Sequence, residues 1–418
     1  MSKFKIPHLK TTLTGPLLTL EKIFLDQHFK IETWFRQQFN ETSPPFYASV
    51  DLRNAGFKMA PVDTNLYPAG FNNLNLNLMP LLIQATASTL SHYFSYCNRL
   101  LLIPENHTRN PYYWENITVL YDILFYAGYD VRIASWVALE QSIHTRSSGL
   151  VHVELLQRKG NKLVINDFIP CAILLNNDLS ENIPDILKGV TQTFIPPLAL
   201  GWHQRKKSQH FKLYEKVTRN FAQLLNIDPW LIHPYHDVLN NIDFSEQENL
   251  NLLSEKVAII LKKIQKKYEE YHIKQKPFVI IKSDSGTYGM AIMSVFHPDD
   301  VKNLNRKQRN KMTSSKSGTA ACHFLIQEGI YTQETLGSHH AVAEPVIYMI
   351  GQHVVGGFYR FHQKRTDHEN LNTPGMHFQT LEISSKPESQ YQTNRFYAYT
   401  VIARLALIAA SKEIGETK

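Results

Sequence analysis

The chain has 418 residues, 43% of them hydrophobic, which is long enough to form two or three packed modules. Lysine and arginine outnumber aspartate and glutamate by 44 to 37, and the net charge of +7 suits an anionic ligand such as a nucleotide as well as a nucleic acid. The longest apolar stretches, such as residues 401–410, fall short of the roughly 20 residues that span a bilayer, so the composition predicts a globular protein with no membrane partner.

The cysteines and the N-terminal segment indicate the cellular compartment of the protein. The three cysteines are an odd number at wide spacing, which fits a reducing compartment and predicts neither a disulfide framework nor a CxxC metal pair: Cys97, Cys171 and Cys322. Residues 1–10 are basic, but the segment that follows alternates apolar with charged residues instead of forming the apolar run of an export signal. We therefore expect a cytoplasmic protein.

The first predicted elements lead into a long loop. Residues 16–39 begin with a proline and carry apolar side chains at a loose helical spacing, which predicts a helix. Residues 46–52 are predicted to form a strand. Residues 53–77 are rich in Gly, Pro, Asn and Asp without any period, and a loop of this length inside a compact domain is typically functional.

A βαβ unit is expected next. A helix from residue 80 to about 98 precedes the apolar strand 100–103. A second helix ends at Gly128 and leads into the strand 130–134, which the connection length favours as a parallel neighbour of the first strand.

The middle of the chain is mixed, and its pattern does not fix a topology. Strand signals recur in three short segments: residues 151–156, 162–165 and 171–175. The basic run 205–207 lacks interleaved aromatic residues, so it is typical of a solvated surface or a helix start and not of a nucleic-acid patch. Residues 248–274 have an apolar stripe opposite lysines, which predicts an amphipathic helix.

The segment after that helix suits phosphate binding. The β-branched strand 278–281 is followed by Lys282 and a loop rich in Ser, Gly and Thr, and then by a second strand, 291–295. A lysine at a strand end supplies a point charge for phosphate oxygens, and such a hairpin can turn several backbone N–H groups toward one anion. The pattern is neither a Walker loop nor a dinucleotide turn, and a hairpin tip without a ligand would have the same spacing.

The segments after residue 322 continue a recognisable order of strands and loops. A strand over 323–326 runs into the acidic stretch around Glu328, and two strands, 344–350 and 353–360, form a hairpin that ends at Arg360. This order resembles an ATP-grasp nucleotide site. The resemblance implies catalytic roles for Lys282 and Arg360 and an ATP site formed by Lys282, Ser283, Ser285, Gly286, Thr287, Tyr288, Gly289, Gln327, Glu328, Gly329, Ile330 and Glu334.

A magnesium site is the weakest part of this resemblance. Many ATP-grasp enzymes carry a Glu-x-Asn pair on a strand near the C-terminus, but here an amphipathic helix, about 395–412, is predicted with no such strand after it. Residues 370–375 resemble the Asn/Gly loop beside the acyl phosphate, although an ordinary turn would look the same. Glu344, Asn370 and Asn372 are therefore the expected Mg²⁺ ligands, with Asp367 and Glu369 as further candidates. The pairs Cys322–His323 and His339–His340 lack a four-ligand spacing, so no transition metal is predicted.

The N-terminal half narrows the family. Residues 49–74, SVDLRNAGFKMAPVDTNLYPAGFNNL, together with 104–110, PENHTRN, resemble the proteobacterial type of glutamate-cysteine ligase over nearly the whole chain. The resemblance implies ATP-dependent synthesis of γ-glutamylcysteine through a γ-glutamyl phosphate, the first step toward glutathione, with ATP and Mg²⁺. The expected substrate-binding residues are Asp51, Arg53, Lys58, Asp63, Asn65, Asn72, Glu105, His107 and Arg109; the cations would pair with carboxylates, and the acids with an ammonium group.

These inferences combine into an α/β fold with α+β elements, an ATP-grasp-like ligase with an N-terminal βαβ substrate domain. We expect an N-terminal α/β substrate-binding domain at 1–140, a mixed middle region at 141–274 and an ATP-grasp-like nucleotide-binding region at 275–418. The partners would be the small molecules glutamate, cysteine and ATP, with no nucleic acid, and the oligomeric state is open. Two alternatives remain: another ATP-grasp amino-acid or peptide ligase, and a basic nucleic-acid-binding protein that uses residues 205–207 and 302–316.

Overall fold

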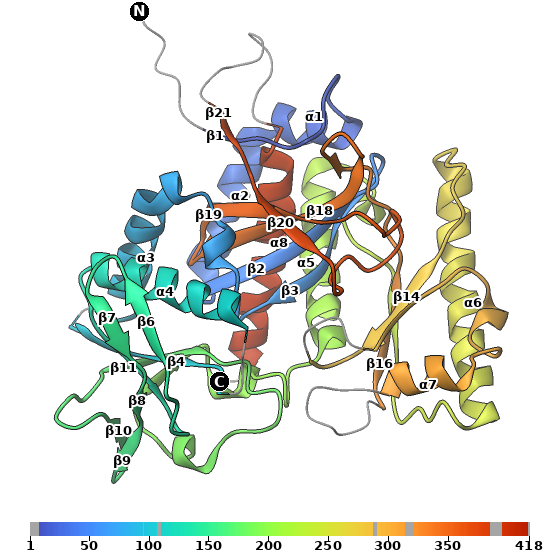
Figure 1. The fold of residues 1–418 in the computed structure, drawn as a ribbon. Helices are drawn as coiled ribbons and strands as arrows, with labels where there is room; N and C mark the ends of the chain where they lie inside the picture. The colour runs from blue at the N-terminus through green and yellow to red at the C-terminus, as the bar shows by residue number, and fades with distance from the viewer. Residues whose placement is uncertain are drawn as a thin grey trace, which may run out of the picture.

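The computed structural model describes residues 8–94, 96–106, 110–286, 291–313, 322–384 and 395–416. Three sheets surround one cavity: a central antiparallel sheet, a parallel sheet beside it, and a smaller antiparallel sheet on the other side (Figure 1). Within the described ranges, every helix is too short or too polar to cross a membrane. The chain therefore has the mixed α/β fold expected from the sequence.

The central sheet joins the two ends of the chain. Its strands lie in the order β20–β19–β18–β2–β3, and β18 pairs antiparallel with both β2 and β19. The orange C-terminal strands β20, β19 and β18 consequently continue into the blue N-terminal strands β2 and β3 in Figure 1. The bounds are β2 Tyr47–Asn54, β3 Met59–Asn65, β18 Ala341–Ile350, β19 His353–His362 and β20 His377–Thr380, with the short β17 Thr335–Leu336 paired to β18.

Strand β3 corrects the prediction of an unbroken loop over 53–77. Pro61 interrupts the strand pattern of the sequence, and a proline argues against a central strand. Here β3 is the last strand of the sheet, where proline is tolerated, and a register shift at Asp51 and Leu52 accommodates it.

Helices cover one face of the central sheet. Helix α8, Tyr397–Glu416, packs on β2, β3 and β18, and α5, Lys207–Leu225, packs on α8. The predicted C-terminal helix is confirmed, but its expected amphipathic character is wrong, because α8 is apolar on nearly all sides and buried among its neighbours. The single helix predicted over 16–39 is two helices, α1 Thr19–Asp26 and α2 His28–Glu41, which meet at Gln27.

The parallel sheet confirms the βαβ prediction. Strand β4, Arg99–Pro104, runs parallel to β5, Asp130–Ser135, through helix α4, Pro111–Tyr126, and β11 pairs with β4 on the other side. The remaining elements of this part are α3 Met79–Tyr93, β6 Ser142–Thr145, β7 Gly149–His152, β8 Glu154–Leu155, β9 Gln157–Lys159, β10 Lys162–Val164, β11 Ala172–Asn176 and β12 Thr193–Ile195.

A disulfide at this sheet contradicts the expectation that the cysteines stay unpaired. Cys97 and Cys171 are bonded, although 74 positions separate them in the sequence. Cys97 precedes β4 and Cys171 precedes β11, and these two strands are neighbours in the sheet. Parallel pairing therefore brings together residues that sequence spacing alone keeps apart. Cys322 is free.

The smaller antiparallel sheet carries the glycine-rich hairpin. Its order is β13–β16–β14–β15, and helix α6 packs behind it over a separate apolar core (Figure 1). The bounds are β13 His236–Leu239, α6 Gln247–Glu270, β14 Val279–Ser283, β15 Ile292–Val295, α7 Arg306–Thr313 and β16 Phe324–Glu328. At the far edge of the molecule, β1 His8–Leu9 pairs with β21 Ile383–Ser384.

Candidate active site

A cavity of about 1190 Å³ lies where the three sheets meet. It is lined by the free face of the central sheet, by the β14 side of the smaller sheet, and by residues that follow β4 and β11. Ligands of α/β proteins typically bind at the carboxyl ends of parallel strands, and Glu105 and Asn177 stand at those ends here. The cavity is therefore the candidate active site.

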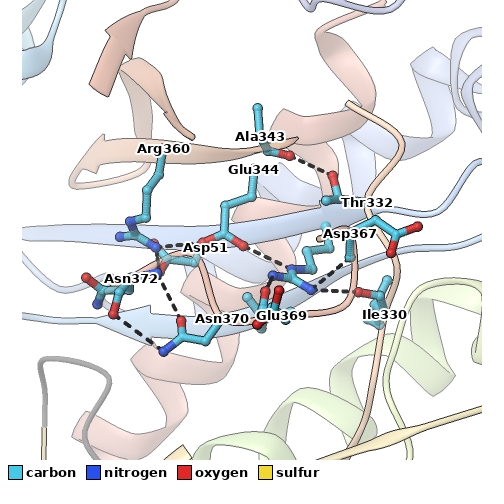
Figure 2. Close-up of polar contacts among 12 residues, drawn as sticks. Asp51, Ile330, Thr332, Ala343, Glu344, Arg360, Asp367, Glu369, Asn370 and Asn372 are labelled. Carbon is cyan, nitrogen blue, oxygen red and sulfur yellow. Dashed lines mark hydrogen bonds and ion pairs between the residues drawn. The ribbon is translucent and has the colours of Figure 1, made fainter. Parts of the chain in front are cut away.

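One arginine is held by two carboxylates on the floor of the cavity. Arg360 Nη1 on β19 donates to Asp51 Oδ2 at 2.7 Å and to Glu344 Oε1 at 2.9 Å, and Figure 2 shows both contacts. Burial disfavours the charged arginine, but Asp51 and Glu344 outweigh burial and raise its pKa further. Burial also raises the pKa of Asp51, with Arg360 opposing the rise and Glu344 adding to it.

Arg53, on β2 of the central sheet, forms hydrogen bonds to two neighbouring loops, one containing Ile330 and one containing residues 367–369. Its Nε donates to Glu344 Oε2 at 2.9 Å, and its guanidinium also donates to the backbone carbonyls of Ile330, Asp367 and Glu369. Both oxygens of Glu344 thus lie against arginines, one on Arg360 and one on Arg53. Arg53, expected to hold a substrate carboxylate, is largely buried and engaged with these groups at the cavity wall.

Lys282 stands where the smaller sheet faces the edge of the central sheet. Its Nζ donates to the Val62 carbonyl on β3 at 2.6 Å. Burial lowers the pKa of Lys282 to about 8, although Asp63 opposes this shift. Burial works against ionisation of Asp63 too, but Lys207 and Lys282 more than offset it and hold the pKa of Asp63 well below its ordinary value. This corner of the cavity therefore contains two cations and one firmly ionised carboxylate.

Lys207 is a cavity residue that the sequence interpretation missed. Its Nζ lies 2.9 Å from both oxygens of Asp63 and 4.2 Å from the centre of the Trp202 ring. A helix start is confirmed for the basic run 205–207, since α5 begins at Lys207. The other expectation, a solvated surface, is wrong for Arg205 and Lys207, which are 5% and 7% exposed. Their burial also removes both from a nucleic-acid patch.

The start of the glycine-rich loop is anchored to α5. Asp284 accepts hydrogen bonds from Ser208 N and Ser208 Oγ, both at 2.7 Å, and its carbonyl accepts from Lys207 N. A carboxylate here satisfies N–H groups that the first turn of a helix leaves open. Ser283, Ser285 and Gly286 line the cavity. The other predicted loop residues, Thr287, Tyr288 and Gly289, lie outside the described residues.

The residues predicted to form the nucleotide hinge, 327–334, do not all lie at the cavity. Gln327, Glu328 and Ile330 line the cavity, and a β-carbon at Gly329 would meet the Phe278 ring at 2.1 Å, so the chain packs tightly there. Glu334 is fully buried elsewhere and accepts from Thr12, Tyr359 and Tyr399; it is not among the cavity-lining residues.

Lys58 is paired with the hinge. Its Nζ lies 2.8 Å from Glu328 Oε2 and 4.3 Å from the centre of the Trp230 ring, and both charged side chains are 1% exposed. Trp230 Nε1 also donates to Glu328 Oε1. Burial lowers the pKa of Lys58 to about 8, with Glu328 opposing the shift. Lys58, expected at a substrate carboxylate, is thus not among the cavity-lining residues.

The remaining predicted substrate residues lie along the parallel-sheet side. Asn65, Asn72 and Glu105 line the cavity. Asn65 is bonded to both backbone groups of Tyr67, and Glu105 accepts from Asp178 N at 3.0 Å. His107 and Arg109 fall outside the described residues.

The predicted metal ligands share one wall. Glu344, Asn370 and Asn372 line the cavity, and Asn370 Oδ1 accepts from Asn372 N at 3.0 Å (Figure 2). Asp51 stands beside Glu344 and uses Oδ2 for Arg360. Within the described ranges, no group of three His, Cys, Asp or Glu side chains is close enough to form a metal centre from protein ligands alone.

Two comparisons with known proteins point to the same family. A family model for glutamate-cysteine ligase matches residues 21–414. A solved structure from Methylobacillus flagellatus KT, provisionally described as a gamma-glutamylcysteine synthetase, is 52% identical, with 100% of both chains covered and a TM-score of 0.87. D-alanyl-alanine synthetase A from Vibrio cholerae O1 biovar eltor str. N16961 aligns over 75% of this chain and 99% of its own at 7% identity, but its TM-score of 0.28 carries no argument. No curated protein matches the sequence.

Proposed function

Because this chain belongs to the glutamate-cysteine ligase family, we propose that its reaction takes place in the cavity between the three sheets. The chain is an ATP-dependent ligase that joins glutamate to cysteine. One observation carries the proposed location: Lys207, Lys282 and Arg360, three buried cations from separate elements, all line this cavity. Lys207 and Arg360 have carboxylate partners, whereas Lys282 donates to a backbone carbonyl, so the phosphates of ATP would supply its anionic partner.

The nucleotide half is proposed to be ATP-grasp-like. Lys282 and the loop that begins at Ser285 would hold the phosphates, and Gln327, Glu328 and Ile330 would line the adenine and ribose side. In support, β14 and β16 are paired neighbours, so Lys282 and Glu328 belong to one sheet that faces the cavity. The expected regions 1–140 and 275–418 would then supply most of the amino-acid site and the nucleotide site, and the middle region 141–274 would add Asp178, Trp202 and Lys207.

The proposed chemistry has two steps. The glutamate side-chain carboxylate attacks the γ-phosphorus of ATP, forming γ-glutamyl phosphate and releasing ADP, while Lys282 and Arg360 offset the charge on the phosphoryl oxygens. The amine of cysteine then attacks the acyl carbon, the amide bond forms and phosphate leaves. The departing phosphate would take up the proton that the amine loses.

A magnesium ion fits this cavity in charge and ligand type. Glu344 and Asp51 place two carboxylates on adjacent strands, and Asn370 and Asn372 add amide oxygens. Mg²⁺ typically binds one or two carboxylates, phosphate oxygens and water, and when bound it would neutralise phosphate charge. We propose these four residues as its surroundings; Arg53 and Arg360 hold Glu344 in place.

The experiment that tests the location measures ADP release by purified protein given Mg²⁺, ATP, glutamate and cysteine. We expect release to require both amino acids, and the Lys282→Met variant to lose it while remaining folded. Lys276→Met, at an exposed lysine near the start of β14, is the matched control and should keep full activity. Wild-type turnover in Lys282→Met would remove the cavity as the site. Replacing cysteine by other amino acids tests the alternative of a related ligase, which would show no preference for cysteine.

The remaining proposals concern the surroundings of the enzyme. ATP and free cysteine are supplied by the cytoplasm, so we propose that location; the Cys97–Cys171 disulfide would meet reducing conditions there. Glutamate, cysteine and ATP are the proposed partners. Thiol labelling of protein purified under acid quench would establish the redox state of these cysteines in cells.

A further inference from the structure

Two aromatic residues that share the neighbours Arg205 and Asp178 carry buried hydrogen-bond donors that nothing in the described part of the chain satisfies. Tyr67 is 4% exposed and Trp202 is 2% exposed, both line the cavity, and neither the Tyr67 hydroxyl nor Trp202 Nε1 has a partner there. An indole N–H can only donate, and a buried donor without an acceptor is costly, so such groups in native proteins need an explanation. An acceptor on a bound ligand would satisfy both.

The acceptor should be an anion. Lys207 Nζ stands 4.2 Å and Arg205 Cζ 4.9 Å from the centre of the Trp202 ring. Burial raises the pKa of Tyr67, so its hydroxyl stays protonated and able to donate. Two neutral donors beside a lysine match a carboxylate, whose oxygens only accept.

The surrounding residues suit an amino acid. Asn65 fixes the backbone of Tyr67 through both of its side-chain groups, which holds the hydroxyl in place. Trp202 N donates to the Asp178 carbonyl at 2.8 Å, and the Asp178 carboxylate is near enough to affect the pKa of Tyr67. Asp178 and Glu105 both line this end of the cavity and contribute negative charge that an ammonium group requires.

The distance from the phosphate corner separates glutamate from cysteine. Lys282 bonds to Val62 on β3, Lys207 to Asp63, and Tyr67 follows the last residue of that strand, Asn65. The two residues from Asp63 to Asn65 correspond to about 7 Å of strand. Cysteine carries its carboxylate on the same carbon as the attacking amine, so this group must stay near the acyl centre. Glutamate has three carbon atoms between its reacting carboxyl and its α-carboxylate, so the α-carboxylate can reach farther.

Another part of the cavity suits the thiol. Apolar and aromatic side chains line it: Val346, Tyr348, Phe358, Met376 and Phe378. A neutral thiol makes favourable contacts with such groups, whereas the second carboxylate of glutamate would be left there without donors.

We propose, on the basis of the function proposed above, that Tyr67 and Trp202 bind the α-carboxylate of glutamate and thereby select glutamate as the acyl donor. The hydroxyl and the indole N–H each donate to this carboxylate, and Lys207 supplies the adjacent positive charge. The same contacts would discriminate against 4-aminobutyrate, which has the reacting carboxyl and the amine of glutamate but lacks the α-carboxylate.

The test compares Tyr67→Phe and Trp202→Phe with a matched control, Tyr214→Phe. Tyr214 is a buried tyrosine outside the cavity whose hydroxyl donates to the Ile232 carbonyl at 2.8 Å. Tyr67→Phe should raise the KM for glutamate about 10- to 100-fold, the effect of losing a hydrogen bond to a charged group, and leave the KM values for ATP and cysteine unchanged. The preference for glutamate over 4-aminobutyrate in kcat/KM should fall by the same factor. Tyr214→Phe should change neither quantity.

Thermal unfolding supplies a readout independent of turnover. The Tm of ligand-free Tyr67→Phe should equal or exceed that of the wild type, because no existing hydrogen bond is lost, while the rise in Tm caused by glutamate should shrink. An unchanged preference over 4-aminobutyrate would overturn the proposal. So would a variant that loses its preference for cysteine over 2-aminoethanethiol, since the donors would then bind the carboxylate of cysteine. Wild-type protein that gains Tm from glutamate through Tyr67 but releases no ADP would refute the proposed reaction and leave this site standing.

Discussion

Arg360 reaches across a whole strand of the central sheet to Asp51, with Nη1 2.7 Å from Oδ2. Arg360 lies on β19 and Asp51 on β2, and β18 runs between them. The guanidinium passes Glu344 on β18, which accepts from the same nitrogen. A C-terminal hairpin and an N-terminal strand therefore contribute to one charged group that lines the cavity.

Replacing Arg360 should separate its chemical role from its structural one. Arg360→Lys keeps a positive charge between the carboxylates but loses the planar fork, so we expect kcat to fall about 10²- to 10³-fold with a small change in Tm. Arg360→Met removes the arginine partner of Asp51 and one of the two arginines at Glu344, and should lower the free energy of unfolding by about 3–5 kcal/mol. Steady-state kinetics and urea denaturation of both variants provide the measurement. Full kcat in Arg360→Lys would contradict a role that depends on guanidinium geometry.

The pKa of Lys282 predicts how ATP use depends on pH. Burial lowers this pKa from 10.5 to about 8, so the free enzyme loses the positive charge as pH rises through 8. We expect kcat/KM for ATP to decline above about pH 8. In Lys282→Arg the side chain stays charged, and this decline should disappear even if the rate is lower. Identical alkaline profiles for the two proteins would exclude Lys282 as the titrating group.

The Lys58–Glu328 pair should behave as one structural unit. Each single change, Lys58→Met or Glu328→Gln, leaves a buried polar or charged group without its partner. We expect each to lower the free energy of unfolding, by about 3–5 kcal/mol for the lysine. The double variant should be more stable than the sum of the single effects predicts, and chemical denaturation of the four proteins measures this coupling. Additive effects would mean that the two charges do not depend on each other.

Glu413 should make the free energy of unfolding depend on pH in the acidic range. It accepts from Arg205 at 2.8 and 3.1 Å and also contacts His210. Burial raises its pKa, but Arg205 and His210 outweigh burial and lower it from 4.5 to about 2. A lowered carboxylate pKa stabilises the fold above pH 4.5, and this contribution is lost as pH falls through 2.

Glu413→Gln is therefore expected to cost about 3–5 kcal/mol of unfolding free energy at pH 7. Its difference from the wild type should shrink between pH 4.5 and 2, as measured by urea denaturation over that range. Glu416→Gln, at an exposed residue in the same helix, is the control and should lie within about 0.5 kcal/mol of the wild type. A difference that stays constant down to pH 2 would rule out this ionisation as the cause.

Local patterns were enough to predict much of the fold. The parallel pair β4 and β5 and the hairpin of β18 and β19 are confirmed close to the predicted limits, because an apolar run with a clear stop signal reports its own secondary structure. Strand β3 was missed because Pro61 hides its pattern, and α8 was taken for amphipathic although it is buried nearly all round.

Local sequence patterns predicted some residues of the candidate site and missed others. Lys282 and Arg360 could be predicted because each lies near the end of a strand in a recognisable order of elements. Lys207 could not, since nothing near the basic run reveals that its third residue would meet Asp63 inside a cavity. The one local hint is Trp202, shortly before the basic run, whose aromatic ring can cover a lysine side chain; in the structure it lies against Lys207.

By itself, the sequence determined the type of most elements, the family and the residue types available for phosphate and amino-acid binding. The tertiary structure alone decided which charges face the cavity and which neutralise one another. Lys58 and Lys282 are both buried lysines, yet one is paired with Glu328 and the other lines the cavity. The reason is physical. A buried charge is paired only when tertiary folding brings its partner close, and that partner can lie hundreds of residues away in the sequence, where no local pattern reveals it.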